Sequence, residues 1–276
     1  MNLQFEKPYK CMVPIEPLHI VVVGVGGTGG HLAPQLARMA WMEQENGRSV
    51  EMTFVDPDVI EEKNIGRQNF CPASVGQYKA IDLALRFNVA YGLKIHAIPH
   101  KFDPAMVSDF GLKHGRRITL IIDCVDNPEA RQEINKIELG KWTWLLSSGN
   151  AASNGQVLIG NAQQPLDANA DAFGFCQYLP SPYIMEPELL TARPGDGQKV
   201  PEKGTQVLMS CADLTAAGLQ ERMVNVHAAA HAAVMVDNFI KGGFTYCGVR
   251  FNIDPPAVQR IDITKSNMGA WLGLGD

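Results

Sequence analysis

The feature that most constrains the fold is a run of glycines between a buried strand and a helix. The stretch "GVGGTGG", residues 24–30, follows the apolar run "HIVVV" and precedes "HLAPQLARMAWM". Gly24, Gly26 and Gly29 match the pattern G-x-G-x-x-G. In this pattern the first glycine permits a tight turn, the second lets the backbone approach a phosphate, and the third lets helix and strand pack closely. Because the N-terminus of a helix also attracts anions, the turn is a candidate phosphate site.

Strand and helix patterns alternate from this turn onward. We expect strands at 19–25, 50–56, 94–102, 118–125, 142–150 and 155–161, and helices at 30–42, 76–91 and 127–139. Such alternation predicts a Rossmann-like, doubly wound α/β fold, with a mainly parallel sheet covered by helices on both faces. Ligands then bind beyond the carboxyl ends of the strands.

The second half of the chain differs in composition and periodicity. Residues 163–209 are rich in Pro, Gly, Asp and Asn and show no sustained period, which predicts a long crossover loop. A largely apolar helix over 211–243 and strands at 244–253 and 258–264 follow. We therefore expect an N-terminal extension, 1–17, and one domain, 18–276.

Composition excludes several classes of partner. The formal net charge is −5 and no basic tract is present, so we expect no nucleic-acid partner. No run approaches the roughly 18 apolar residues that span a bilayer, and the N-terminus lacks an apolar signal core. The six cysteines form no C-x-x-C pair, which argues against a disulfide framework. These features predict a cytoplasmic protein without a membrane partner.

The polar residues that follow Asp56 indicate which nucleotide the site binds. Asp56 ends the second strand, where a carboxylate can accept the hydroxyls of a ribose, so the glycine turn and Asp56 are compatible with NAD and with ATP. The donors that follow are Asn64, Arg67, Gln68 and Lys79. Arginine and lysine stabilise the charge that develops on an α-phosphate and a departing pyrophosphate. This set favours nucleotidyl transfer over hydride transfer.

Two carboxylates end the strand in "LIIDCVDNPEARQEIN". Asp123 and Asp126 lie at the mouth of the expected sheet, where carboxylates can hold Mg²⁺ bound to ATP. Either one could instead cap the helix that begins near Asn127. We assign the metal to Asp126 and a structural or outer-shell role to Asp123.

Four segments together resemble the ThiF/MoeB and ubiquitin-activating E1 superfamily. They are "GVGGTGG", "VDPDVIEEKNIGRQNF", "VGQYK" and "DCVDNPEAR", in the family's order and at nearly its spacing. The resemblance covers about residues 18–160 and weakens to "SCADLTAAGL" and the helix that follows it. A narrower resemblance is to the ThiF-related members of plasmid-associated PRTRC cassettes.

The resemblance implies adenylation of the C-terminal glycine carboxylate of a small ubiquitin-like or sulfur-carrier protein, with ATP and Mg²⁺. It places Arg67, Lys79 and Asp126 in catalysis, with Asp126 on the metal. It also implies that Cys211 can become covalently linked to the activated partner protein. The nucleotide-binding residues that it implies are Gly24, Gly26, Gly27, Gly29, Asp56, Asn64, Arg67, Gln68 and Lys79.

Three departures from the family pattern qualify these expectations. Relatives commonly carry two C-x-x-C zinc pairs, whereas only Cys176 lies near the first pair here, so we expect no structural zinc. The N-terminus lacks the arginine-containing helix that reaches a partner subunit's ATP in relatives, although we still expect a homodimer through the apolar C-terminal helix. The spacing from Arg67 to Lys79 is one residue shorter, which a loop can absorb.

Two other functions remain open from the sequence. One is a catalytically silent, E1-like scaffold that binds nucleotide, and the other is an NAD-dependent oxidoreductase. His227 and His231 lie four residues apart on the expected helix, but alanines fill the turn between them. We therefore expect packing or subunit contact there rather than a metal site. Of Trp142 and Trp144, at least one should pack against a helix.

Overall fold

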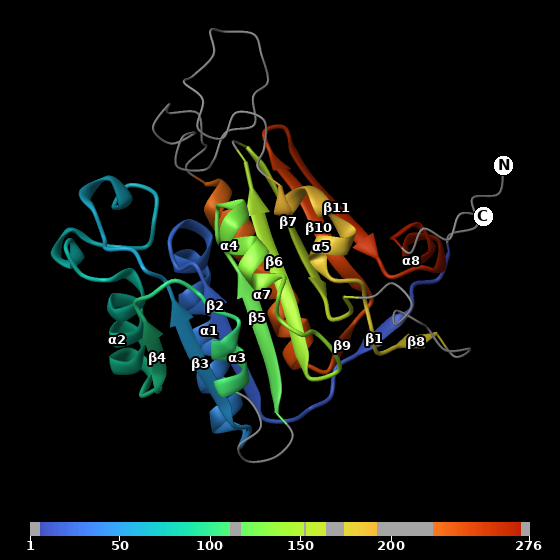
Figure 1. Ribbon diagram of the computed structural model, residues 1–276, viewed down its shortest axis with the longest axis horizontal. Coiled ribbons are helices and arrows are strands. Elements are labelled where there is room, and N and C mark those ends of the chain that lie inside the picture. Colours follow the sequence, from blue (N-terminus) through green and yellow to red (C-terminus); the bar gives the residue numbers. More distant parts are fainter. Residues whose placement is uncertain (1–5, 111–116, 152, 164–173, 192–222, 272–276) are drawn as a thin grey trace, which may run out of the picture.

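A central sheet of eight strands organises the structure, a computed structural model that describes residues 6–110, 117–151, 153–163, 174–191 and 223–271 (Figure 1). The strands are β2 (Leu18–Val23), β3 (Val50–Val55), β4 (Ile95–Ile98), β5 (Ile118–Asp123), β6 (Thr143–Asn150), β7 (Asn154–Gly160), β10 (Tyr246–Ile253) and β11 (Pro256–Asp262). Their order across the sheet is β11-β10-β7-β6-β5-β2-β3-β4.

The strands from β6 to β4 run parallel, and β7, β10 and β11 continue the sheet antiparallel. Every residue of β2 and β5 is buried, as expected for parallel strands that are covered on both faces. The prediction of an α/β fold with a mainly parallel sheet is confirmed.

Helices cover both faces of the sheet. Helices α1 (Gly27–Glu45) and α7 (Val224–Ile240) lie behind it in Figure 1 and contact each other, and α2 (Lys79–Tyr91) packs against α1, β3 and β4. Helices α3 (Ala105–Phe110), α4 (Pro128–Ile134) and α5 (Pro182–Met185) lie in front of it. Further short helices are η1 (Glu62–Asn64), η2 (Pro72–Ser74), η4 (Pro187–Leu190) and α8 (Lys265–Trp271).

A second, three-stranded sheet was not predicted. It consists of β1 (Lys10–Met12), β8 (Phe175–Cys176) and β9 (Gly243–Phe244), with β1 in the middle. Strands of two or three residues are too short to show an alternating pattern, so the sequence carries no periodic signal for them. The sheet joins the N-terminal segment to two distant parts of the chain.

The predicted long crossover loop over 163–209 has more regular structure than expected in residues 174–191. This part contains β8, α5 and η4, and it buries Leu179, Tyr183 and Leu189. The buried residues are too irregularly spaced to form a period, so the sequence gives no signal for these short elements. Residues 164–173 and 192–222 lie outside the described part of the chain.

Several helix boundaries also differ from the prediction. Helix α4 ends at Ile134 instead of near 139, and α1 begins at Gly27, within the glycine run. Asn127 caps α4, since its side-chain oxygen accepts a hydrogen bond from the backbone N–H of Ala130 at 2.8 Å. The cap is therefore neither of the two aspartates that the sequence offered for it.

Aromatic contacts fix α7 against the sheet. Trp144 of β6 is buried and meets Phe239 of α7 edge to face, with ring centroids 5.4 Å apart, as expected for one of the two tryptophans. The rings of His227 and His231 both lie against Phe251 of β10, so these histidines pack as predicted. No described helix is both long and apolar enough to span a membrane.

Candidate functional site

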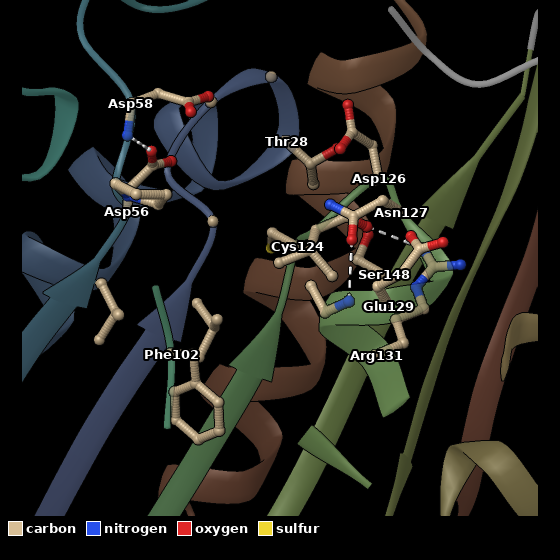
Figure 2. A pocket seen from close by; sticks show the side chains of 18 of the residues that line it. Thr28, Asp56, Asp58, Phe102, Cys124, Asp126, Asn127, Glu129, Arg131 and Ser148 are labelled. Atoms are coloured by element: carbon tan, nitrogen blue, oxygen red, sulfur yellow. Dashed lines mark hydrogen bonds between the residues drawn. The ribbon is translucent and has the colours of Figure 1, made fainter. Parts of the chain in front are cut away.

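A cavity of about 690 Å³ lies at the carboxyl ends of the parallel strands (Figure 2). Val23 of β2 pairs with Val55 of β3 and with Asp123 of β5, so the chain leaves all three strands at the same level. The predicted site residues that line the cavity are Gly24, Gly26, Gly27, Asp56, Arg67, Gln68, Lys79 and Asp126. Segments that are far apart in sequence thus meet at one edge of the sheet.

The glycines of the turn have different physical roles. Gly24 has a φ of +83°, and a Cβ there would lie 2.9 Å from the carbonyl oxygen of Cys124. A Cβ at Gly29 would lie 2.0 Å from the carbonyl oxygen of Gly24, so Gly29 permits α1 to begin against the strand. Gly29 does not line the cavity. Gly26 is the N-cap of α1 and its Cβ position is free of close contacts, which leaves that space to a ligand.

Asp56 follows β3 and is held by backbone hydrogen bonds. Its Oδ2 accepts from the N–H of Val25 at 2.8 Å, and its Oδ1 accepts from the N–H of Asp58 at 2.9 Å. Burial raises the pKa of Asp56, and the nearby Lys79 partly offsets this effect. An ionised carboxylate accepts about four hydrogen bonds, so Asp56 can still accept from a vicinal diol.

Lys79, the first residue of α2, is buried and paired. Its Nζ lies 2.7 Å from Oδ2 of Asp58, and its backbone N–H donates to the carbonyl of Asp58 at 2.9 Å. Asp58 was missed, although a second carboxylate in "DPD" was the available signal. Because the side chain of Asp58 is 64% exposed, water can replace the lysine if an anion draws it away.

Arg67 and Gln68 carry unpartnered atoms. Arg67 Nε and Gln68 Oε1 are buried, and neither has a hydrogen-bond partner among the described residues. A buried polar group without a partner costs about 1–3 kcal/mol, so such atoms in a cavity indicate a ligand or water. Asn64, in contrast, does not line the cavity: its Oδ1 accepts from the N–H of Glu61, and its carbonyl accepts from the N–H of Gln68.

The two aspartates at the end of β5 differ sharply. Asp123 is fully buried and accepts hydrogen bonds from Ser147 Oγ at 2.6 Å and Tyr183 OH at 2.9 Å. The Nε of Arg131 lies 3.5 Å from it. Asp126, in contrast, is exposed where it lines the cavity. This geometry agrees with a structural role for Asp123 and leaves Asp126 accessible to a metal.

The cavity fits ATP with Mg²⁺. Within the described ranges no three His, Cys, Asp or Glu side chains are grouped to hold a metal by themselves. Mg²⁺ instead usually binds one or two carboxylates together with phosphate oxygens and water. Asp126 can supply the carboxylate, the unpartnered Arg67 Nε suits an anionic ligand, and the unpartnered Gln68 Oε1 can accept from a donor group of that ligand.

Sequence reasoning missed much of the rest of the lining: some of these residues lie inside the quoted motifs but were given no role, and the others lie outside every motif. They include Thr28, Asp58, Lys101, Phe102, Glu129, Arg131, Ser148, Asn150 and Asn225.

Of the five described cysteines, Cys124 lines the cavity and the other four do not. Cys211 falls outside the described residues. Cys176 is buried in β8, where it pairs in register with Cys11 of β1, and burial raises the pKa of the Cys11 thiol. Cys71 is the exposed thiol of the described chain.

The fold and the cavity define the class: a Rossmann-like α/β protein in which a glycine turn, a buried carboxylate and cationic side chains surround one pocket. The chain belongs to the ThiF family, whose model matches residues 8–231.

Comparisons with individual proteins agree with this assignment. The chain is 28% identical over 190 residues to mouse ubiquitin-like modifier-activating enzyme 6, covering 65% of this chain and 18% of that enzyme. It is 34% identical over 149 residues to rat ubiquitin-like modifier-activating enzyme 5, covering 49% of this chain and 34% of the relative. It therefore matches only a minor part of each enzyme.

A solved structure shares the fold. The crystal structure of E. coli MccB with ATP superposes with a TM-score of 0.54 at 16% identity, over 89% of this chain and 63% of that one.

Proposed function

We propose that the protein activates the C-terminal carboxylate of a small ubiquitin-like or sulfur-carrier protein by adenylation with ATP and Mg²⁺. The observation that carries this proposal is the position of the unpartnered Arg67 and Gln68 atoms in the cavity that also contains Asp56 and Asp126. The ThiF family and the similarity to ubiquitin-like modifier-activating enzymes support it.

The chemistry needs positioning and charge neutralisation more than acid–base groups. A carboxylate oxygen of the partner attacks the α-phosphorus of ATP, the bond from that phosphorus to the bridging oxygen breaks, and pyrophosphate leaves. No proton is transferred, because the nucleophile is already an anion. Arg67 and Lys79 would hold the charge that develops on the phosphates, with Lys79 exchanging Asp58 for phosphate. Mg²⁺ held at Asp126 would neutralise part of the same charge.

The test is ATP–pyrophosphate exchange with a candidate partner that ends in Gly-Gly. Neighbouring genes are the natural source of that candidate. Exchange that requires the partner's free carboxylate supports the proposal. Stabilisation by ATP–Mg²⁺ in a thermal-shift assay without any exchange would favour a silent nucleotide-binding scaffold. Stabilisation by NAD but not by ATP would favour an oxidoreductase.

We further propose a transfer step at Cys211. The thiolate would attack the acyl carbon of the adenylate, the mixed-anhydride bond would break with loss of AMP, and a thioester would form. Cys211→Ser should leave exchange nearly intact and abolish a reductant-sensitive adduct with the partner. The exposed Cys71, changed to Ser, is the matched control and should keep the adduct. If the parent protein forms no adduct with ATP and its partner, the enzyme stops at the acyl-adenylate.

A homodimer is the third part of the proposal. Most of the apolar side chains of α7 are buried within the chain itself, so the composition of this helix no longer argues for a dimer. The remaining apolar stripe consists of Met223, which precedes α7, and Ala230 and Val234. Sedimentation velocity at several concentrations tests this stripe. Val234→Asp should shift a dimer to monomer, and an unchanged profile would place the interface elsewhere.

A further inference from the structure

Four uncharged polar side chains meet at the β6 end of the cavity. They come from three elements: Thr28 from α1, Ser148 and Asn150 from β6, and Asn225 from α7, and all four line the cavity. Asn150 Nδ2 donates to Thr28 Oγ1 and to Asn225 Oδ1, both at 2.9 Å, and Thr28 Oγ1 donates to Asn225 Oδ1 at 3.3 Å. We call these residues the amide cluster.

The amide cluster keeps donors that no described residue accepts from. Asn225 is buried and its Oδ1 accepts two hydrogen bonds, but its Nδ2 donates to no described residue. Ser148 is 3% exposed, and its hydroxyl also has no hydrogen-bond partner within the described chain. Buried polar groups are nearly always paired, so the buried Ser148 hydroxyl indicates an acceptor supplied from outside the described residues. Asn225 also lines the cavity, and its Nδ2 is available to donate to the same acceptor.

Gly27 makes room for this arrangement. A Cβ at Gly27 would lie 2.8 Å from Asn225 Oδ1, so any larger residue would push the amide away from the glycine turn. The start of α7 is therefore fitted to the start of α1, although 197 residues separate Thr28 from Asn225.

The position of the amide cluster identifies its ligand within the proposed reaction. Figure 2 shows Thr28 and Ser148 on the side of Asp126, away from Asp56 and Phe102. In sheet order the strand ends run from β3 with Asp56, through β2 with the glycine turn and β5 with Asp126, to β6. If the ribose lies at Asp56 and the phosphates at the turn, the group that attacks the α-phosphorus approaches from the β6 end.

We propose that the amide cluster binds the last peptide group of the acyl substrate, with Asn225 and Ser148 donating to its carbonyl oxygen. None of the four side chains is charged, which suits a neutral peptide group better than a phosphate or a second carboxylate. The site thereby accepts polypeptide C-termini and rejects simple carboxylic acids. This inference rests on the proposed function.

Ligand-observed NMR with the full chain tests the inference without any turnover. The probes are N-acetyl-glycylglycine and hexanoate, which has a carboxylate but no amide, each added with a non-hydrolysable ATP analogue and Mg²⁺. The parent should bind the peptide and not hexanoate. Asn225→Leu, which is nearly isosteric, and Ser148→Ala should each weaken peptide binding by about tenfold. This factor is equivalent to roughly 1.4 kcal/mol, in the upper part of the range for one hydrogen bond.

Asn238→Leu is the matched control, because Asn238 lies on the same helix and donates to Tyr246 OH, away from the cavity. It should bind the peptide like the parent. Parent-like peptide binding by Asn225→Leu and Ser148→Ala, or no peptide binding by the parent, would overturn the inference. If the two variants lost affinity for the ATP analogue by the same factor as for the peptide, the amide cluster would belong to the nucleotide site. Absent binding of the ATP analogue counts against the proposed function instead.

Discussion

Two groups of polar residues around the cavity are built in opposite ways. The donor group centres on Arg67, whose buried Nε has no partner among the described residues, and the neighbouring Gln68 leaves its acceptor Oε1 equally unpartnered. The anchor group centres on Asp123, which takes hydrogen bonds from Ser147 and Tyr183 and an ion pair from Arg131. Both groups lie at the carboxyl edge of the same sheet, so the difference does not come from the fold alone.

The contrast separates residues that hold the site from residues that serve a ligand. An unpartnered donor lowers the stability of the free protein and can release that cost on binding. A saturated carboxylate stabilises the free protein and has little capacity left for a ligand. Substitutions in the anchor group should therefore affect folding first, and substitutions in the donor group should affect function first.

The largest expected effect is the loss of folding stability in Asp123→Ala. Removing one member of a buried ion pair leaves the other charge uncompensated and typically costs 3–5 kcal/mol, here the charge of Arg131. Urea denaturation measures the free energy of unfolding, and Tyr183→Phe, which removes one hydrogen bond, should lose only about 1 kcal/mol. Asp126→Ala, at an exposed site, should stay within about 0.5 kcal/mol of the parent.

Two outcomes of this experiment are decisive. Equal losses in Asp123→Ala and Asp126→Ala would remove the distinction between the two strand-end carboxylates. If Asp123→Ala does not accumulate as folded protein, Asp123→Asn and Tyr183→Phe still rank the anchor contacts.

The second effect is catalytic. Arg67→Ala should slow adenylate formation by about a hundredfold, or roughly 3 kcal/mol, because its contact should strengthen as charge develops in the transition state. Its ATP affinity should fall by a smaller factor, and its stability should stay close to the parent's. Pyrophosphate exchange and calorimetry measure the two quantities. If rate and affinity fell by the same factor, Arg67 would be only a ground-state anchor.

The third effect concerns metal dependence. Asp126→Ala should remove the part of the ATP affinity that depends on Mg²⁺, because Asp126 is the accessible carboxylate at the end of β5. Calorimetry with and without Mg²⁺ isolates that part. The same dependence on Mg²⁺ in variant and parent would contradict the assignment of the metal to Asp126.

The parallel half of the fold was predictable because its signals are local. β2 and β5 are predominantly apolar segments that the structure buries completely, and the glycine turn lies between a strand and a helix. The small sheet was not predictable, because β1, β8 and β9 gain their stability from pairing across the chain and not from a pattern.

The candidate site likewise contains residues that a local sequence pattern predicts and residues that only long-range packing brings together. Asp56, Arg67 and Lys79 occur in one short stretch whose residue types favour phosphate, and all three line the cavity. Tyr183 reaches Asp123 from 60 residues away, and Asn225 reaches Thr28 from 197 residues away. No motif records such contacts, because packing of α5 and α7 against the sheet creates them.

The smallest expected effect concerns Asp56, which combines features of both groups, since it is buried and held by backbone N–H groups yet lines the cavity. Burial raises its pKa, so between its unfolded and folded pKa values the folded state binds more protons. The stability of the parent should then fall as the pH rises from about 3.8 through the folded pKa. In Asp56→Asn this decline should be absent. The free energy of unfolding of the variant minus that of the parent should therefore increase toward neutral pH, whatever static cost the amide brings.

The same substitution should weaken ATP binding at neutral pH, because one carboxylate oxygen becomes a donor where the ribose hydroxyls need an acceptor. Denaturation at several pH values and calorimetry at neutral pH measure the two effects. A stability difference that stays constant with pH would place Asp56 with the anchors, as a carboxylate whose charge the fold already compensates. If the difference in unfolding free energy grew with pH while the ATP affinity stayed unchanged, Asp56 would not be part of the nucleotide site. Only a growing difference together with weaker ATP binding fits a carboxylate kept charged, against its own burial, for a ligand.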